Sequence, residues 1–243
     1  MGRGIAAGSL VRHTARLRAT LAGLGYPIAQ GSEQIIALEA GTEVATLALL
    51  SGTNGAFVLE SDGLSINTVS STVNRVSTSG TTANQIDSTE DARTGGDLVL
   101  QAGGSLTING GTATPTSGVS VGGNLDLKTT GTGSAITVNA GVSSTGSSVM
   151  QATGTLTLNA AMDSTGNVLL KTTGTGSNIA LAAGLTSAGN VSLDASGNVT
   201  QSADGDIAVT GSATTLDVLA GGGITMTTGA VSQTRQGSVR YEA

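Results

Sequence analysis

The stretch NLDLKTTGTGSAITVNAGVSSTG, residues 124–146, returns as NVLLKTTGTGSNIALAAGLTSAG at residues 167–189. The two copies are identical at 14 of 23 positions, and most of the differences keep the polarity of the residue, as between Leu125 and Val168. A shorter unit, residues 147–166, separates the copies, and the same 43-residue offset carries it onto residues 190 onward. Such a fixed period indicates one structural unit used several times, here a long coil followed by a short one.

Apolar residues alternate with polar ones inside each copy. In the first copy they are Leu125 and Leu127, then Ile136 and Val138; in the second they are Val168, Leu170, Ile179 and Leu181. Alternation with a period of two places these residues on one face of an extended strand. Each coil is therefore expected to contain two or three short strands, separated by turns rich in Gly, Asn, Ser and Thr.

A single coil cannot bury its own apolar face, but stacked coils can. If each strand pairs in parallel with its copy in the next coil, at a spacing of about 4.8 Å, like residues form ladders. The connections are too short for helical crossovers, which disfavours a doubly wound α/β fold. The sequence thus predicts an all-β protein, a right-handed parallel β-helix of about seven coils, with the handedness taken from the general rule for parallel crossovers.

Three regions are expected along the chain. Residues 97–243 form the regular β-helix, which ends in the first strand of a further coil at SVRYEA, and residues 112–117 form a small bulge within it. Residues 46–96 form one or two irregular coils and a polar excursion at 68–96, with one weak strand at 73–76. The inward residues of this region are predicted to be Leu47, Leu49, Phe57, Leu59, Leu64 and Ile66.

Residues 1–45 differ from the repeats. Leu10, Leu17, Leu21 and Leu24 fall at helical spacing beside three arginines, so a short basic amphipathic helix is expected, either on a membrane surface or as a cap on the first coil. A third alternative is that this stretch precedes the true fold. Charges interrupt every candidate apolar core, so the segment does not have the pattern of a signal peptide.

The composition suits a narrow core. The chain has 38 Gly, one Phe, two Tyr and no Trp or Cys. Disorder is the alternative for a Gly- and Ser-rich chain, but 38% hydrophobic residues at period two argue against it. Four of the ten basic residues precede residue 19, whereas all sixteen acidic residues follow residue 30. The chain after residue 18 is therefore acidic, which argues against nucleic acid as a partner because the phosphate backbone needs basic residues.

No catalytic, cofactor or metal site is predicted. His13 is the only histidine, which excludes a His/Cys metal site and a Ser/His/Asp triad in the repeats. Asp204-Gly205-Asp206 is interpreted as a turn in preference to a calcium site. Asp126, Asp163 and Asp194 come from different coils, and Lys128 and Lys171 are interpreted as solubilising groups.

Two columns of polar residues are expected on the outside. Thr137, Thr157 and Thr225, flanked by Thr107 and Thr200, form one column, for which strand propensity is a simpler explanation than an ice-binding face. Asn124, Asn167 and Asn190 precede the first strand of their coils and are expected to stack at a corner.

GNVSLDASGNVTQ (189–201), GNLDLKTTG (123–131) and AGGGITMTTGAV (220–231) give residues 97–243 a resemblance to the passenger regions of filamentous haemagglutinin-like adhesins, large bacterial exoproteins. The resemblance implies a β-helical filament, two-partner secretion, a secreted or outer-membrane-associated location, and adhesion to host or neighbouring-cell surface molecules. It departs from the family pattern in two respects: neither the N-terminal secretion domain with its NPNG-like motif nor a signal peptide is recognised in this sequence.

The resulting expectation is a non-enzymatic structural segment of a surface adhesin, acting as a rod. We expect further repeats of a longer chain, no cofactor and no transmembrane segment. The alternative is a polysaccharide-binding or polysaccharide-cleaving β-helix. Cleavage requires paired carboxylates, and binding usually relies on aromatic residues that this chain almost lacks.

Overall fold

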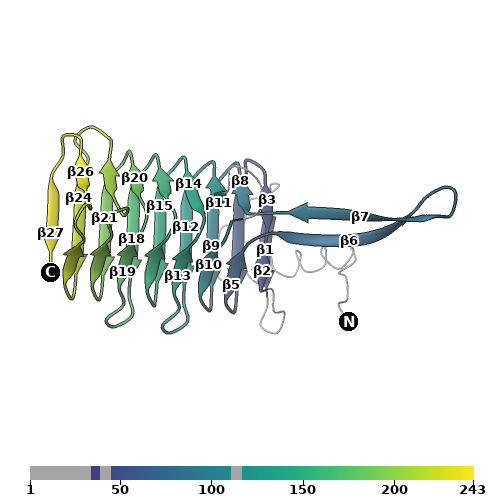
Figure 1. Ribbon diagram of the computed structural model, residues 1–243, viewed down its shortest axis with the longest axis horizontal. Helices are drawn as coiled ribbons and strands as arrows, with labels where there is room; N and C mark the ends of the chain where they lie inside the picture. Colours follow the sequence, from purple (N-terminus) through teal and green to yellow (C-terminus); the bar gives the residue numbers. More distant parts are fainter. Residues whose placement is uncertain (1–33, 39–44, 111–116) are drawn as a thin grey trace.

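The computed structural model describes residues 34–38, 45–110 and 117–243. Within this part the chain is all-β and forms a parallel β-helix of eight coils followed by one more strand (Figure 1). The predicted fold class is confirmed. The expected N-terminal helix and most of the expected bulge at 112–117 lie outside the described residues, although the register between β11 (Ser117–Val121) and β14 (Gly141–Ser144) shifts at Ser117.

Each coil contributes one strand to each of three parallel sheets, named here A, B and C. Sheet A has nine strands: β1 (Gln34–Leu38), β4 (Ala56–Glu60), β9 (Leu98–Ala102), β12 (Leu125–Thr129), β15 (Ser148–Ala152), β18 (Val168–Thr172), β21 (Val191–Ala195), β24 (Leu216–Ala220) and β27 (Val239–Glu242). At about 4.8 Å per strand the stack is roughly 40 Å long.

Sheets B and C are built from shorter strands. Sheet B contains β2 (Thr46–Leu47), β5 (Leu64–Ile66), β10 (Leu106–Ile108), β13 (Ile136–Val138), β16 (Leu156–Leu158), β19 (Ile179–Leu181), β22 (Val199–Gln201) and β25 (Ile224–Met226). Sheet C contains β3 (Leu49–Ser51), β8 (Ala92–Thr94), β11, β14, β17 (Met162–Ser164), β20 (Leu185–Ser187), β23 (Ile207–Val209) and β26 (Ser232–Thr234).

The core is a set of apolar ladders inside the three sheets. Leu125 pairs with Leu98 and Ser148, and Leu127 pairs with Leu100 and Met150. The alternate apolar residues of the two repeat copies are all buried. The 43-residue repeat is therefore a unit of two coils, and its apolar alternation is the burial pattern of the strands.

The first described coils depart from the expectation at β4. Phe57 and Leu59 were predicted to point inward, but Ala56, Val58 and Glu60 are the buried residues. The prediction was wrong because AFVLE has apolar residues at both alternate sets of positions, so the alternation does not show which face of the strand is buried. Pairing with β9, which aligns Val58 with the buried Leu100, fixes the register and leaves the bulky Phe57 outside the narrow core.

The polar excursion takes the form of an antiparallel hairpin. β6 (Val69–Val76) and β7 (Thr82–Thr89) pair along eight residues and project past the first coil (Figure 1). Gly80 has a φ of 77°, and its amide donates to the carbonyl of Ser77 at 3.0 Å. The chain then returns to sheet C at β8, so the stack continues in register across the insertion.

The two long coils contain a matched loop after their sheet A strand. Gly133 and Gly176 occupy the same position in the two repeat copies and have φ values of 70° and 67°. This left-handed conformation favours glycine and explains the shared sequence TTGTGS. The coils that follow them, which begin at β15 and β21, omit this loop.

Candidate functional site

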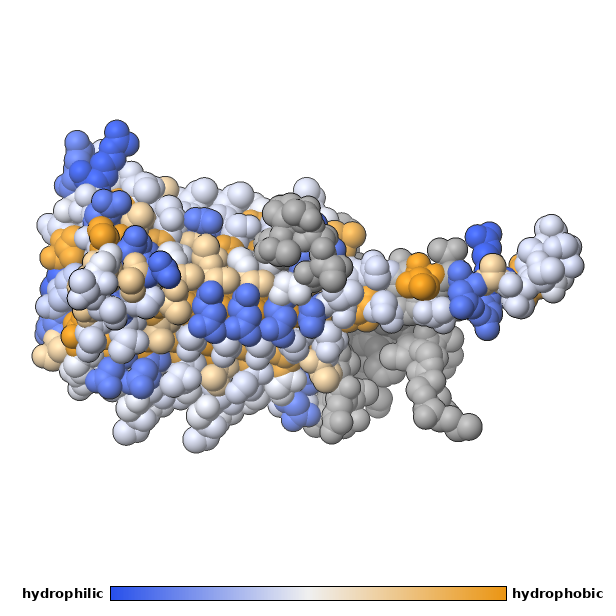
Figure 2. All heavy atoms as spheres, viewed as in Figure 1, coloured by the Kyte–Doolittle hydropathy of each residue, from blue (hydrophilic) through white to orange (hydrophobic). Residues whose placement is uncertain are grey.

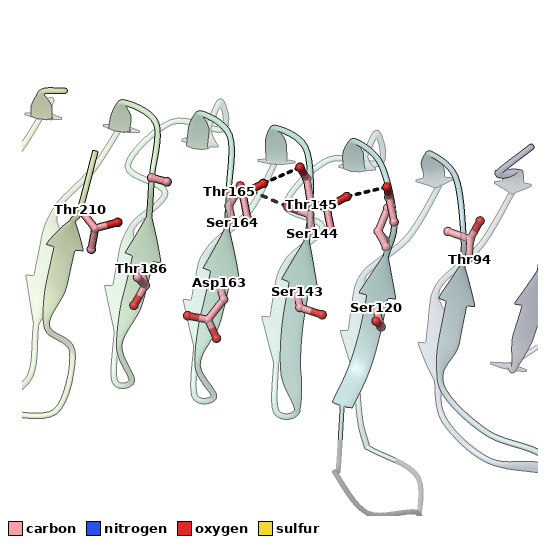
Figure 3. A pocket seen from close by; sticks show the side chains of 13 residues that line it. Thr94, Ser120, Ser143, Ser144, Thr145, Asp163, Ser164, Thr165, Thr186 and Thr210 are labelled. Carbon is pink, nitrogen blue, oxygen red and sulfur yellow. Dashed lines mark hydrogen bonds between the residues drawn. The ribbon is translucent and has the colours of Figure 1, made fainter. Parts of the chain in front are cut away.

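A shallow groove runs along the outside of sheet C. It encloses about 560 Å³. Its lining extends from Thr94 on β8 to Thr210, which directly follows β23, and so crosses six successive coils (Figure 3). Sequence analysis did not identify this groove.

The floor of the groove is a column of outward side chains. Ser120, Ser143, Asp163 and Thr186 occupy the middle of β11, β14, β17 and β20 and are paired in register. Their side chains make no hydrogen bond with any other side chain or backbone group of the described residues. Three hydroxyls and one carboxylate are therefore available to a ligand at intervals of about 4.8 Å.

One wall of the groove is a row of threonines held by the backbone of the preceding coil. Thr145 Oγ1 donates to Gly122 O at 2.5 Å, and Thr210 Oγ1 donates to Ser187 O at 3.1 Å. Thr165 likewise donates to the carbonyl of Thr145 (Figure 3). These bonds fix the threonine side chains, so the wall is rigid without a ligand.

The buried corner behind the groove is also polar. Ser144 Oγ lies 2.7 Å from Ser148 Oγ and 3.1 Å from Ser164 Oγ, and Ser164 Oγ donates to Gly146 O at 2.8 Å. These serines are almost fully buried and satisfied by one another and by the backbone. They therefore support the strand ends and are not free to bind a ligand.

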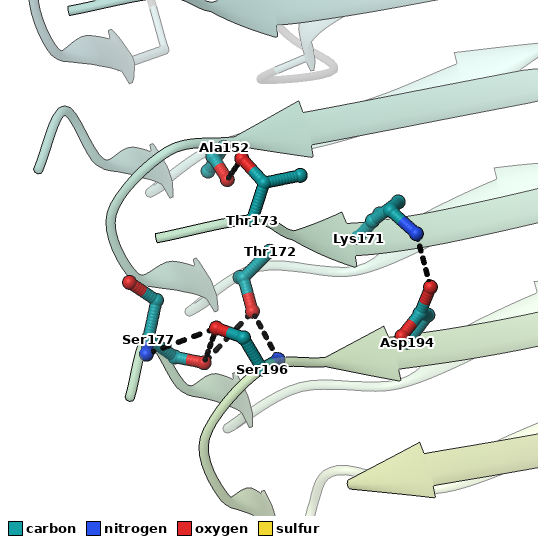
Figure 4. Close-up of polar contacts among 7 residues, drawn as sticks. All are labelled: Ala152, Lys171, Thr172, Thr173, Ser177, Asp194 and Ser196. Atoms are coloured by element: carbon teal, nitrogen blue, oxygen red, sulfur yellow. Dashed lines mark hydrogen bonds and ion pairs between the residues drawn. The ribbon is translucent and has the colours of Figure 1, made fainter. Parts of the chain in front are cut away.

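Asp126 and Asp194, the other two aspartates considered for catalysis, lie on sheet A. Asp126 is aligned with Val99 and Val149, and its pKa is raised above the usual value because burial disfavours the charged form, an effect that nearby Lys128 partly offsets. Asp194 forms an ion pair with Lys171 of the preceding coil (Figure 4). Asp163 is thus the only carboxylate that lines the groove.

A second charged cluster lies at β24 and β27. Arg240 makes two hydrogen bonds to the carboxylate of Asp217, at 2.8 Å each, and a third to Glu242 at 2.8 Å. The hydrogen bonds from Arg240 lower the pKa of Asp217, and burial opposes this only in part. The charges of this cluster are paired with each other.

The corner between sheets A and B repeats one hydrogen-bond network. Thr172 Oγ1 donates to Ser177 O at 2.7 Å, and the amide of Ser196 in the next coil donates to Thr172 Oγ1 at 3.1 Å (Figure 4). Thr129, Ser134 and Thr153 repeat the arrangement two coils earlier. These polar residues satisfy backbone groups at the turn and are structural.

The predicted asparagine corner is observed, with other residues in the same ladder. Asn190 Nδ2 donates to Asn167 Oδ1 at 3.3 Å, and Asn124 Nδ2 donates to Asp97 Oδ1 at 3.2 Å. Ser147 lies between Asn124 and Asn167 in the ladder. The side-chain oxygens accept amides of the adjacent coil, so the ladder links coil to coil.

The predicted threonine column is also observed, on sheet B. Its members, from first coil to last, are Thr46, Ser65, Thr107, Thr137, Thr157, Ala180, Thr200 and Thr225. Most strands of this sheet have three residues, of which the middle one points outward. The face therefore presents a single column of hydroxyls, which Ala180 interrupts.

The Asp204-Gly205-Asp206 stretch forms a turn. Asp206 Oδ1 accepts the amide of Val231 in the next coil at 2.8 Å, and Gly205 N donates to Ser202 O at 3.1 Å. Among the described residues, no three His, Cys, Asp or Glu side chains gather closely enough to hold a metal ion. In the same part of the chain, no helix is long and apolar enough to cross a membrane.

The hairpin is the second candidate surface. Val76 and Ile86 are 65% exposed, and hydrophilic or neutral residues surround the hydrophobic ones (Figure 2). Its base is anchored by Asp91, which is fully buried, has a φ of 65° and forms a 2.8 Å ion pair with Arg93. β-Branched residues in 69–76 and 82–89 around Gly80 were the signal that could have predicted it.

Comparison with family models, with curated proteins and with solved structures finds no match to this chain. The fold itself, a parallel β-helix of repeated coils, is what the observations establish.

Proposed function

We propose that this chain is a non-enzymatic, rod-forming segment of a secreted or surface-attached bacterial adhesin of the filamentous haemagglutinin-like type. Its partners would be molecules on host or neighbouring cells, and other repeats of the same kind of chain. The observation that carries the proposal is the continuous stacking of eight coils, which is kept across the inserted hairpin.

A rod function follows from how the coils are joined. Each strand of β4 to β24 in sheet A pairs on both sides, and hydrogen-bonded side-chain ladders link the corners of adjacent coils. Bending such a stack would break several parallel ladders together, so it resists bending. The hairpin β6–β7 projects from this rod and is exposed along its length, as a contact element would be.

The competing function, cleavage of polysaccharides, has less support. Hydrolysis of a glycosidic bond generally uses two carboxyl groups about 5–10 Å apart. The groove on sheet C is lined by the single carboxylate of Asp163, while Asp126 and Asp194 belong to sheet A. Binding without cleavage remains compatible with the groove and is developed below.

The proposal is tested with beads coated with the whole 243-residue chain. Attachment to a panel of bacterial and epithelial cells under flow should exceed attachment of albumin-coated beads. A variant in which residues 69–89 are replaced by a short Gly-Ser linker should retain the β-sheet circular dichroism spectrum, and its attachment reports whether the hairpin makes the contact. Failure of the coated beads to attach to every cell type would overturn the adhesive role. Release of new reducing ends from pectin, alginate or chondroitin would overturn the non-enzymatic one.

A further inference from the structure

The groove on sheet C is a hollow on the outer face of the stack. It is lined by residues of six coils, and its long direction follows the stacking axis of the solenoid (Figure 3). A ligand that fills it must therefore be extended, and it would meet a similar set of groups at each coil, about 4.8 Å apart.

The groups that line the groove select the chemistry of that ligand. The lining contains hydroxyls, methyl-bearing side chains and one carboxylate, but no Lys or Arg. An anionic polymer would face the carboxylate of Asp163, and the cation beside the groove, Arg93 on β8, is in register with Ser120 but is paired with Asp91. A nucleic acid is disfavoured for the same reason, since its backbone requires basic contacts.

A neutral polymer rich in hydroxyls fits these groups. The free side chains of Ser120, Ser143 and Thr186 can each donate and accept a hydrogen bond, and Asp163 accepts. The wall threonines are already fixed by the backbone, so binding would order few side chains and would lose little conformational entropy.

We propose that the groove on sheet C binds a linear neutral glycan lying along the solenoid axis, with its sugar hydroxyls bonded to the floor residues Ser120, Ser143, Asp163 and Thr186. This inference rests on the proposed function, because it names the class of cell-surface molecule that the adhesive rod would contact. No aromatic side chain lines the groove, so the sugars do not stack on a ring. Affinity for a short oligosaccharide is expected to be weak, and many parallel rods would raise it through avidity.

The test uses the whole chain and cellohexaose, a linear neutral glucan, with binding followed by saturation-transfer NMR and calorimetry. Ser143→Arg places a long side chain across the floor in the fourth coil. Thr137→Arg is the matched control, because Thr137 lies in the same coil, is also half-buried and points outward from sheet B. Ser143→Arg should weaken binding at least about tenfold, and Thr137→Arg should leave it unchanged.

Asp163→Lys is a second variant at an exposed floor position and covers the case in which Ser143→Arg fails to fold. It should weaken cellohexaose binding and permit binding of hexagalacturonate, an anionic hexamer that the wild-type groove should reject. Absence of cellohexaose binding to the wild-type chain, equal losses in Ser143→Arg and Thr137→Arg, or preference of the wild type for hexagalacturonate would each overturn the inference. The bead assay tests the adhesive role separately. Oligosaccharide binding without attachment to cells would reject the adhesive role and support glycan binding in the groove. Attachment to cells without oligosaccharide binding would support the adhesive role and reject glycan binding in the groove.

Discussion

Replacing Leu156 by Ala should destabilise the rod far more than replacing Ile224 by Ala. Both residues begin a sheet B strand and belong to one inward column. Leu156 is fully buried between Ile136 and Ile179, whereas Ile224 is only partly buried against the core. The two variants therefore compare a coil in the middle of the stack with the last complete coil.

The magnitudes follow from burial. Truncating a fully buried leucine costs about 2–5 kcal/mol, depending on how well the cavity can collapse. The strands on both sides of Leu156 are held by continuous ladders, which oppose collapse, so a loss of about 3–5 kcal/mol is expected. Ile224 keeps part of its surface in water, and its truncation should cost roughly 1 kcal/mol.

The assay is urea unfolding followed by far-UV circular dichroism, with hydrogen exchange to locate the change. Leu156→Ala should lower the midpoint and raise exchange in the coils on both sides, because each coil contacts only its neighbours. Ile224→Ala should raise exchange only near β25. Equal losses for the two variants would refute the view that stability is built from local coil-to-coil contacts.

Three further predictions concern other positions. Gly103→Ala should cost about 1–3 kcal/mol or more in urea unfolding, because a Cβ there would overlap the backbone of the preceding coil, while Gly52→Ala, which has open space, should cost little. Asp126→Asn should raise the melting temperature at neutral pH, because burial raises the pKa of Asp126 and the wild type loses stability as the pH rises through that pKa. Thermal melts across pH should show that this gain vanishes below about pH 3, where Asp126 is protonated in the folded and unfolded protein. Lys171→Met should lower stability by less than about 1 kcal/mol at low salt and not at all at high salt, because both partners of its ion pair with Asp194 are about one-third exposed.

Sequence reasoning predicts sheets A and B well because their inward residues are large and apolar. Leu125, Leu127, Ile136 and Val138 were all predicted to share one face and are all buried. It fails where alternation is ambiguous, as at Phe57, since both faces of that strand are apolar and only its neighbours decide. The fold is thus predictable from one repeated coil, but the register of an irregular coil is not.

The same reasoning leaves the candidate site undetected for a physical reason. In sheet C the outward residues Ser143 and Asp163 lie beside the buried Ser144 and Ser164, so polarity does not separate the two faces at these positions. The inward Val142 and Met162 reveal the strands but not a groove on their outer face. The groove arises only when these strands are stacked beside one another, so it is a property of the stack and of no single segment.

A stack of similar coils must also avoid sliding out of register, and the differences between coils serve this purpose. In the native stack, short coils without the loop lie next to the loops of Gly133 and Gly176, and displacement by one coil would bring these two loops together. A displacement would also separate Lys171 from Asp194, which form an ion pair between adjacent coils. The irregular features are therefore what make one register unique, and the regular ladders are what make it stable.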